Sequence, residues 1–218
     1  MKIGILFDLD GTLLDTLDDL TASVNYAMEQ YGLPLRTKEQ VRRAIGSGAK
    51  KLIARSLPGL PGDPPVDDVL ATYQAFYREN SRVHTCPYAG VTEALEELKK
   101  DYPIGIVSNK PDGPTKSLCA DFFPGIYARG ESDDCTRKPA PDMLNKTMQL
   151  LGVDSCIYVG DSDVDVLTAQ NTGVKCLSVT WGFRDEADIR QAGGEYFCRD
   201  TKTLAATLKQ MVKELYGQ

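Results

Sequence analysis

Short apolar segments alternate with segments of helical periodicity along most of the chain. The apolar segments are rich in β-branched residues, which is typical of buried strands. Six are found, the last two with weaker patterns: Ile3–Phe7, Ile104–Ser108, Cys156–Gly160, Lys175–Val179, Gly125–Ala128 and Tyr196–Cys198. The helical patterns between them are Val91–Lys100, Met143–Leu151, Val164–Asn171 and Leu204–Leu215. This alternation predicts an α/β fold with a doubly wound, mostly parallel sheet (a Rossmann-like core) covered by helices on both faces.

The interval between the first two predicted strands is too long for an ordinary crossover connection. It carries helical spacing throughout, in four patterns: Leu17–Tyr31, Lys38–Ile45, Lys50–Leu57 and Val66–Arg82,. We therefore predict an inserted α-helical cap domain at residues 15–83 and a core domain formed by residues 1–14 and 84–218. The two connections between these domains are candidate hinges.

The composition is that of an ordinary globular protein and limits the classes of partner. A chain of 218 residues with 42% hydrophobic residues can form one large domain or two modest ones with a sizeable core,. The formal net charge of −6 disfavours nucleic acid and anionic membrane surfaces,. No segment approaches the roughly 20 apolar residues of a membrane span. We therefore expect no nucleic-acid or membrane partner, and an anionic substrate must be attracted by a local cluster of cations.

The cysteines and the single histidine, His84, do not form a metal-binding set. The six cysteines contain no C-x-x-C pair, and one histidine cannot complete a zinc site,. We predict reduced structural cysteines and a structural role for His84. The apolar run at the N-terminus ends at Asp8 and is too short for a signal peptide,. These features predict a cytoplasmic protein, and they leave a homodimer open.

Two acids follow the first predicted strand, in the order Asp8-Leu9-Asp10-Gly11. Alternate residues of an extended segment point the same way, so Asp8 and Asp10 can share one face. Two carboxylates at such a short distance repel each other unless they share a cation or a proton. Gly11 allows a sharp turn just after the pair. Taken alone, the motif also fits a strand end followed by an acidic turn.

Three further motifs place polar side chains beside other predicted strands. Ser108 and Asn109 end the second strand, Lys138 precedes a proline-rich helix start, and Asp161 and Asp165 lie four residues apart where a helix begins. Each motif alone fits a turn, a solvated charge or an acidic helix N-terminus. Ligands of open α/β sheets bind outside the carboxyl ends of the strands, so together the motifs predict one anion site. Its oxygen donors suit Mg²⁺.

The ordered set DLDGT, VSNK, RKPAPD and GDSDVD resembles the four motifs of the haloacid dehalogenase superfamily of phosphohydrolases. The helical insertion lies where that family carries a cap domain. The motif spellings, together with the segment DTLDDLTASVNYAM, are most similar to the phosphoglycolate phosphatase branch. Dehalogenases of the superfamily have tyrosine at the position of Asp10, and phosphonatases have alanine. An acid at this position favours a phosphate-ester hydrolase.

The resemblance implies catalytic roles for residues of the core motifs. Asp8 is the nucleophile that becomes an aspartyl phosphate. Asp10 protonates the leaving alkoxide and then deprotonates the water that hydrolyses the intermediate. Ser108 and the Asn109 amide bind phosphoryl oxygens, and Lys138 neutralises charge on both the phosphate and the nucleophile.

The resemblance also implies a magnesium site. Its ligands are the Asp8 carboxylate, the Asp10 backbone carbonyl and the Asp161 carboxylate, with Asp165 placed to orient this shell. Cations are needed because a carboxylate cannot approach a phosphate dianion without them.

The predicted cap contains a basic stretch within an acidic chain. Seven basic residues stand against one acid, Glu39: Arg36, Lys38, Arg42, Arg43, Lys50, Lys51 and Arg55. In resembling enzymes the cap loop reaches the leaving group, so Gly46, Ser47, Gly48 and Lys51 are candidates for substrate binding. A solvated helix face explains the same charges and stays open. If the basic stretch binds the substrate, we expect a compact phosphorylated metabolite with a second anionic group, and 2-phosphoglycolate is the first candidate.

Other functions are weighed against this one. β-Phosphoglucomutase-like enzymes share a histidine early in the insertion. This chain has Asn25 in that region, which argues against a mutase. An inorganic pyrophosphatase on the same core stays open, because pyrophosphate is also small and anionic. A phospho-receiver signalling module has its phosphorylated aspartate after the third strand and no large insertion. A binding protein without catalysis has little support, because every catalytic position is filled.

Overall fold

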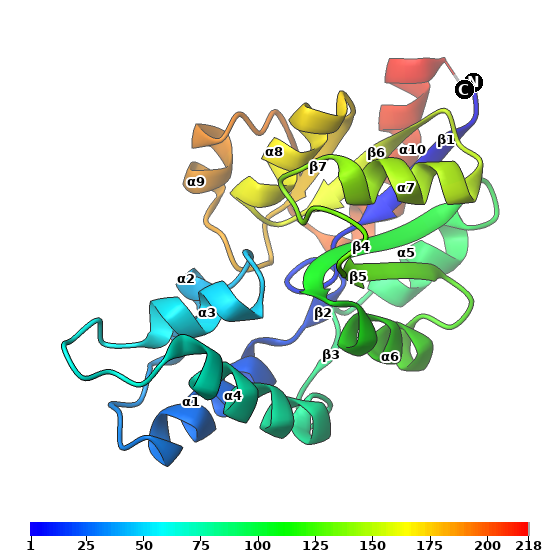
Figure 1. Cartoon of the computed structure of the whole chain (residues 1–218). Coiled ribbons are helices and arrows are strands. Elements are labelled where there is room, and N and C mark those ends of the chain that lie inside the picture. Colours follow the sequence, from blue (N-terminus) through cyan, green and yellow to red (C-terminus); the bar gives the residue numbers. More distant parts are fainter. Residues whose placement is uncertain (218) are drawn as a thin grey trace. The chain divides into compact units, whose positions relative to one another are not determined.

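The computed structural model describes residues 1–217, and the chain forms two compact units (Figure 1). One unit is Asp15–Cys86, and the other combines Met1–Leu14 with the chain from Pro87 onward. The sequence predicts the second connection after residue 83, whereas the observed division falls after Cys86. No helix within the described residues has both the length and the apolar character needed to cross a membrane.

The core unit contains a six-stranded sheet in the order β5-β4-β1-β6-β7-β8. Neighbouring strands pair in parallel. The strands are β1 (Ile3–Phe7), β4 (Ile104–Pro111), β5 (Tyr127–Glu131), β6 (Ser155–Gly160), β7 (Lys175–Val179) and β8 (Tyr196–Cys198). The chain adds β4 and β5 on one side of β1 and then returns to place β6 on its other side. The order therefore reverses beside β1, and ligands of such sheets bind at this switch point.

Helices pack on both faces of the sheet. They are α5 (Val91–Leu98), α6 (Asp112–Phe122), α7 (Asp142–Leu151), α8 (Asp163–Thr172), α9 (Glu186–Gln191) and α10 (Leu204–Tyr216). Ile5 and Phe7 of β1 belong to a hydrophobic cluster shared with α5 and α10. Leu6 belongs to a second cluster, shared with α7 and α8. Alternating side chains of one strand thus reach two helical layers, which confirms the predicted doubly wound fold.

The sequence pattern does not predict two helices of the core unit, α6 and α9. The α6 helix begins with Asp112-Gly113-Pro114, residues that are typical of turns,. Proline is nevertheless tolerated in a first helical turn, where the backbone N–H has no partner within the helix. The α9 helix has six residues, too few to show a helical period,. The β5 strand begins two residues later than predicted, because Gly125 adopts a left-handed turn with φ of 81°,.

The other unit is helical, as the insertion pattern predicts. Its helices are α1 (Leu17–Gln30), α2 (Lys38–Ala44), α3 (Ala49–Ser56) and α4 (Val66–Asn80). The α2 helix begins with a capping box in which the Thr37 hydroxyl and the Gln40 amide each bond the other residue's backbone N–H,. The two connections between the units contain β2 (Leu14–Asp15) and β3 (Cys86–Pro87), which pair as a small separate sheet.

Asp19 joins α1 to the last residues of the helical unit. Its carboxylate accepts hydrogen bonds from the backbone N–H of His84 at 3.0 and 3.1 Å and from that of Thr85 at 2.9 Å. The Asp19 residue is only 2% exposed. The His84 side chain itself is exposed, so His84 contributes here through its backbone.

Replacing Asp19 by Ala should lower the free energy of unfolding by about 1–3 kcal/mol, because two backbone N–H groups lose a buried acceptor. A thermal melting curve should then shift down by several degrees. The matched control is Asp18→Ala. Asp18 is about half exposed and pairs with Lys38 at 2.6 Å, and such surface pairs contribute little. Equal shifts in the two variants would contradict this role of Asp19.

Candidate active site

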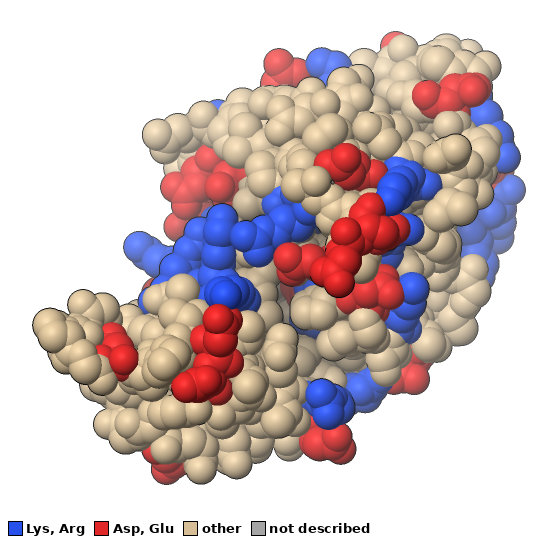
Figure 2. All heavy atoms as spheres, in the orientation of Figure 1, with Lys and Arg blue, Asp and Glu red and all other residues tan. Residues whose placement is uncertain are grey.

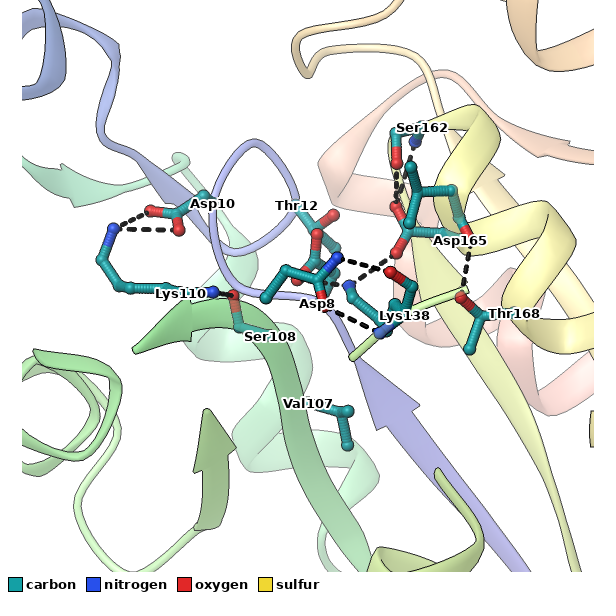
Figure 3. Close-up of polar contacts among 12 residues, drawn as sticks. Asp8, Asp10, Thr12, Val107, Ser108, Lys110, Lys138, Ser162, Asp165 and Thr168 are labelled. Carbon is teal, nitrogen blue, oxygen red and sulfur yellow. Dashed lines mark hydrogen bonds and ion pairs between the residues drawn. The ribbon is translucent and has the colours of Figure 1, made fainter. Parts of the chain in front are cut away.

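The carboxyl ends of neighbouring strands bring the predicted core motifs together (Figure 3). Asp8 follows β1, Ser108 lies near the end of β4, and Asp161 follows β6. Because β1 lies between β4 and β6, the three strand ends share one edge of the sheet. Lys138 reaches the same place from the segment between β5 and α7. The site belongs entirely to the core unit.

Lys138 is the buried cation of this site. Its Nζ atom lies 2.9 Å from Asp8 Oδ1 and 2.8 Å from Asp165 Oδ1. It also donates a hydrogen bond to the Tyr158 hydroxyl at 2.8 Å. Burial alone would lower the pKa of Lys138, but the Asp165 and Asp8 carboxylates raise it above its ordinary value,. The side chain therefore stays a cation although it is only 2% exposed.

The Asp165 carboxylate is fully buried and accepts hydrogen bonds at both oxygens. Its Oδ1 accepts from Lys138 Nζ at 2.8 Å and from the Tyr158 hydroxyl at 3.2 Å. Its Oδ2 accepts from the backbone N–H and the hydroxyl of Ser162 at 3.1 and 2.6 Å. A side chain at Gly160 would collide with it, since a Cβ atom there would lie 2.3 Å from Asp165 Cβ. Asp165 is thus a fixed anion that orients Lys138.

Asp161 is held by residues distant in the sequence. Its Oδ1 accepts from the Thr12 hydroxyl at 3.1 Å, and its Oδ2 accepts from the Phe183 backbone N–H at 2.6 Å. The backbone of Gly182 passes so close that a Cβ atom there would lie 2.3 Å from Asp161 Cβ. The Trp181 indole donates to the Thr12 carbonyl at 3.1 Å. The segment after β7 thus packs against the site.

Two of the buried acids, Asp8 and Asp161, have pKa values raised well above their ordinary range. Burial raises the pKa of Asp8 to about 8, with Lys138 opposing the shift and Asp165 and Asp161 adding to it. Burial also raises the pKa of Asp161 to about 7, and Asp165 adds to that increase. Both shifts express the cost of placing negative charges together away from water. A divalent cation among the carboxylates would offset this cost.

The acids fit a magnesium ion. Asp8, Asp161 and Asp165 each place one carboxylate oxygen within 4.8 Å of the others. No group in residues 1–217 donates a well-aligned hydrogen bond to the buried Asp8 Oδ1 atom, although the Lys138 ammonium lies 2.9 Å away. A set of carboxylate oxygens suits Mg²⁺ better than zinc. The Asp10 carboxylate is paired with Lys110, and the ligand that the resemblance implies for this residue is its backbone carbonyl.

Asn109 holds the backbone of Lys138 from both sides. Its Nδ2 donates to the Lys138 carbonyl at 2.9 Å, and its Oδ1 accepts from the Lys138 N–H at 2.8 Å. Asn109 is 4% exposed. The resemblance implies that the Asn109 amide binds phosphoryl oxygens. In this structure both polar atoms of its side chain are bonded to the Lys138 backbone, so the side chain fixes the segment that carries the buried cation.

The end of β4 is irregular and brings Lys110 to Asp10. Residues 107 and 111 of β4 pair with residues 129 and 131 of β5, so β4 carries extra residues in a bulge,. The bulge needs glycine on the neighbouring strand, because a Cβ atom at Gly130 would lie 2.6 Å from the Lys110 carbonyl oxygen. The Lys110 ammonium donates to both Asp10 carboxylate oxygens at 2.9 Å (Figure 3).

Further residues contact the site without a role predicted from the sequence, among them Thr12, Lys110 and Tyr158. Thr12 and Lys110 belong to the DLDGT and VSNK motifs, and this membership is the signal that could have singled them out. Tyr158 lies in the apolar run of β6, where its hydroxyl cannot be told from ordinary core packing. Its bond to Lys138 depends on strand neighbours that only the fold reveals.

The predicted substrate loop of the cap connects α2 and α3. Gly46 and Gly48 have φ angles of 109° and 84°, which residues other than glycine rarely adopt,. Arg55 of α3 donates to the Ala44 carbonyl at 3.0 Å and to the Ser47 hydroxyl at 3.4 Å. Arg55 therefore supports the loop.

Lysine and arginine side chains gather over α2 and α3 (Figure 2). Four of them form ion pairs with acids of the same unit: Arg42 and Arg43 with Glu39, Lys38 with Asp18, and Lys50 with Asp67. The Lys51 residue is exposed, and its side chain forms no ion pair or hydrogen bond within the described residues. Of the predicted cap residues, Lys51 is thus the cation left for an external anion.

The chain is similar to known phosphatases over most of its length. Residues 5–179 match the family model described as haloacid dehalogenase-like hydrolase. Phosphoglycolate phosphatase 1 of Pseudomonas aeruginosa is 34% identical over 198 residues, which cover 86% of this chain and 72% of that protein. The phosphoglycolate phosphatase of Nitrosococcus oceani is 31% identical over 198 residues, 86% of this chain and 88% of that protein.

Solved structures of similar proteins support the same family. A protein from Lactobacillus delbrueckii subsp. bulgaricus superposes with a TM-score of 0.87 at 33% identity, covering 94% of this chain and 98% of that one. A protein from Haemophilus somnus gives a TM-score of 0.85 at 27% identity, covering 93% and 96%. Both are described as predicted phosphoglycolate phosphatases. The inferred branch is therefore confirmed: the chain belongs to the haloacid dehalogenase-like hydrolases, and it is a phosphoric monoester hydrolase.

Proposed function

We propose that this enzyme is a Mg²⁺-dependent phosphatase that hydrolyses 2-phosphoglycolate through an aspartyl phosphate on Asp8. The observation that carries the proposal is the surroundings of Asp8. Its carboxylate lies beside the buried Lys138 ammonium at 2.9 Å and within 4.8 Å of the Asp161 and Asp165 oxygens. Such a group of acids around one cation suits a nucleophile that must meet a phosphate dianion.

The reaction proceeds in two steps. An Asp8 oxygen forms a bond to phosphorus while the bond to the ester oxygen breaks, and Asp10 gives that oxygen its proton. Water then attacks the aspartyl phosphate, Asp10 takes the proton, and inorganic phosphate leaves with Asp8 restored. Lys138 offsets charge on Asp8 and the phosphoryl oxygens, and Ser108 with the Asn109 backbone amide binds those oxygens.

Mg²⁺ would be held by the Asp8 and Asp161 carboxylates and the Asp10 backbone carbonyl. When bound, it supplies positive charge that offsets the repulsion between Asp8 and the phosphate. Asp165 orients the site through Lys138, since four donors already occupy its two oxygens,. Thr12 and the Phe183 backbone fix Asp161 in the same way.

The substrate is inferred from the relatives' names and from the charge of the cap. The core residues contact only the phosphoryl group, which every phosphate ester shares. Discrimination therefore falls to the cap, where we propose that Gly46–Gly48 and Lys51 receive the second anionic group. The free Lys51 ammonium and the left-handed backbone at Gly46 and Gly48 support this proposal.

We also propose a cytoplasmic location, supported by six free cysteines, of which four are buried. Burial raises the pKa of the Cys119 and Cys156 thiols to about 12, so both are inert packing groups,. A homodimer stays a prediction.

A panel of phosphate esters tests the proposed substrate. We expect the highest kcat/KM for 2-phosphoglycolate, a lower value for p-nitrophenyl phosphate and sugar phosphates, and little hydrolysis of pyrophosphate. Release of inorganic phosphate in the presence of Mg²⁺ measures all of them. Pyrophosphate as the best substrate would identify the pyrophosphatase alternative instead.

The cap contribution is tested in the same assay with Lys51→Met. A charge-assisted contact contributes roughly 1.5–3 kcal/mol, so kcat/KM for 2-phosphoglycolate should fall at least tenfold relative to that for p-nitrophenyl phosphate. The matched control is Lys50→Met, since Lys50 is already paired with Asp67 at 2.7 Å. Arg55 is left intact because it supports the loop. An equal fall in kcat/KM for the two substrates would mean that the basic stretch is only a solvated helix face.

A further inference from the structure

Lys110 and Asp10 form a nearly buried ion pair beside the nucleophile. The ammonium lies 2.9 Å from both Asp10 carboxylate oxygens, so one cation holds the two oxygens symmetrically. The side chains of Lys110 and Asp10 are 5% and 12% exposed. Charge pairs with so little solvent contact keep much more of their attraction than surface pairs do. The pair is separate from Lys138, whose partners are Asp8, Asp165 and Tyr158.

The backbone of Lys110 is itself fixed. Its N–H donates to the Ser108 hydroxyl oxygen at 3.2 Å, and its carbonyl accepts from the Thr115 hydroxyl at 3.2 Å. The bulge of β4 against Gly130 sets where this segment passes β5. Bulges of this kind redirect side chains and recur beside active sites. The Lys110 side chain therefore reaches Asp10 from a backbone that is held in place.

Asp10, by contrast, lies on a turn. It follows the end of β1 and precedes Gly11, which has a φ of 84°. A carboxylate in such a place has several rotamers open to it unless another group selects one. Proton transfer requires hydrogen-bond distance to the oxygen concerned, and a displacement of about 1 Å can cost a hundredfold in rate.

We propose that Lys110 is a positioning residue that orients the Asp10 carboxylate for its proton transfers. The inference rests on the proposed function, in which Asp10 first protonates the leaving oxygen and then deprotonates water. Both steps use the same side chain, so one positioning cation serves the whole cycle. The Lys110 ammonium is paired with Asp10, and we propose that it acts on the reaction through that carboxylate.

A double-mutant cycle tests the proposal with 2-phosphoglycolate and p-nitrophenyl phosphate as substrates. Lys110→Met should lower kcat by roughly ten- to a hundredfold with little change in KM, because orientation is lost while phosphate binding is kept. Lys110→Arg keeps the charge and should recover much of the loss. In an Asp10→Asn background, Lys110→Met should lower kcat by less than about twofold, because the group it positions is already gone. Circular dichroism melting checks that each variant folds.

A second readout follows the intermediate. p-Nitrophenolate leaves without a proton, so Lys110→Met should give a rapid burst of product and then slow turnover as the aspartyl phosphate accumulates. The matched control is Lys116→Met, which removes an exposed lysine of α6 that pairs with Asp112 at 2.7 Å. It should leave both rates unchanged.

Two outcomes would overturn the role of Lys110. A raised KM with unchanged kcat would mean that Lys110 binds the substrate itself. An equal loss of kcat in both backgrounds would mean that it acts independently of Asp10. Failure of the proposed function has a different signature, since Asp10→Asn alone would then turn over 2-phosphoglycolate as fast as the unmodified enzyme.

Discussion

Asp8→Asn is expected to lower kcat by roughly four orders of magnitude or more. The amide keeps the shape of the side chain but has no charged oxygen to attack phosphorus, and loss of an essential nucleophile commonly costs this much. Single-turnover and steady-state phosphate release measure the loss. Mass spectrometry of rapidly quenched enzyme should detect a phosphorylated residue at Asp8 in the unmodified protein and none in the variant.

The variant should keep its fold, which separates lost chemistry from unfolding. Burial raises the pKa of Asp8 to about 8, so the folded protein bears a cost for the charged form that a neutral amide avoids,. Lys138 keeps Asp165 at 2.8 Å and the Tyr158 hydroxyl as partners. The melting temperature without metal at pH 8 should therefore be no lower than that of the unmodified protein.

Asp163→Asn is the matched control for this change. Asp163 opens α8 in the same GDSDVD motif, but its side chain is 44% exposed and its Oδ1 lies 3.4 Å from Arg184. We expect activity within a few-fold of the unmodified enzyme. If Asp8→Asn were as active as Asp163→Asn, the aspartyl-phosphate route would be wrong.

The strands of the core could be predicted because a strand that is buried on both faces consists of consecutive apolar residues. The β1 residues Ile3–Phe7 are all buried, and their predicted bounds are the observed ones. The α6 helix cannot be predicted from its sequence, because its first turn contains Gly113 and Pro114, whose local preference favours a turn,. Here packing against the sheet decides, through the buried Leu118 and Cys119.

The acids of the site could be predicted because each follows a strand, and parallel strands end at a common edge. Partners set by tertiary geometry could not. Lys110 meets Asp10 through a bulge that depends on Gly130 of the next strand, and no pattern within VSNK encodes that register. Asn109 likewise holds a lysine that lies 29 residues away in the chain. Motif membership marks such residues, but their contacts come from the fold.

Removing Mg²⁺ should abolish activity, and restoring it should recover the full rate. Three buried acids face one another across distances of at most 4.8 Å, and the single charge of Lys138 beside Asp8 does not balance them when a phosphate dianion arrives. Excess chelator should therefore reduce phosphate release to background. Ca²⁺ should restore little, because its larger and looser coordination shell misplaces the phosphoryl group. Full activity in excess chelator would contradict the metal site.

The pH dependence of metal binding gives a readout that needs no turnover. Burial raises the pKa of Asp8 to about 8 and that of Asp161 to about 7 without metal, so Mg²⁺ must displace protons below these values,. Calorimetric affinity for Mg²⁺ should therefore rise from pH 6 to pH 8. Over the same range the metal-free protein should lose stability, because its folded state holds protons that the unfolded carboxylates have already released. Stabilisation by Mg²⁺ should thus be largest at pH 8.

In Asp161→Asn one of these acids is gone, so the rise in Mg²⁺ affinity with pH should be shallower and the affinity lower throughout. An affinity independent of pH in the unmodified protein would place the metal away from Asp8 and Asp161.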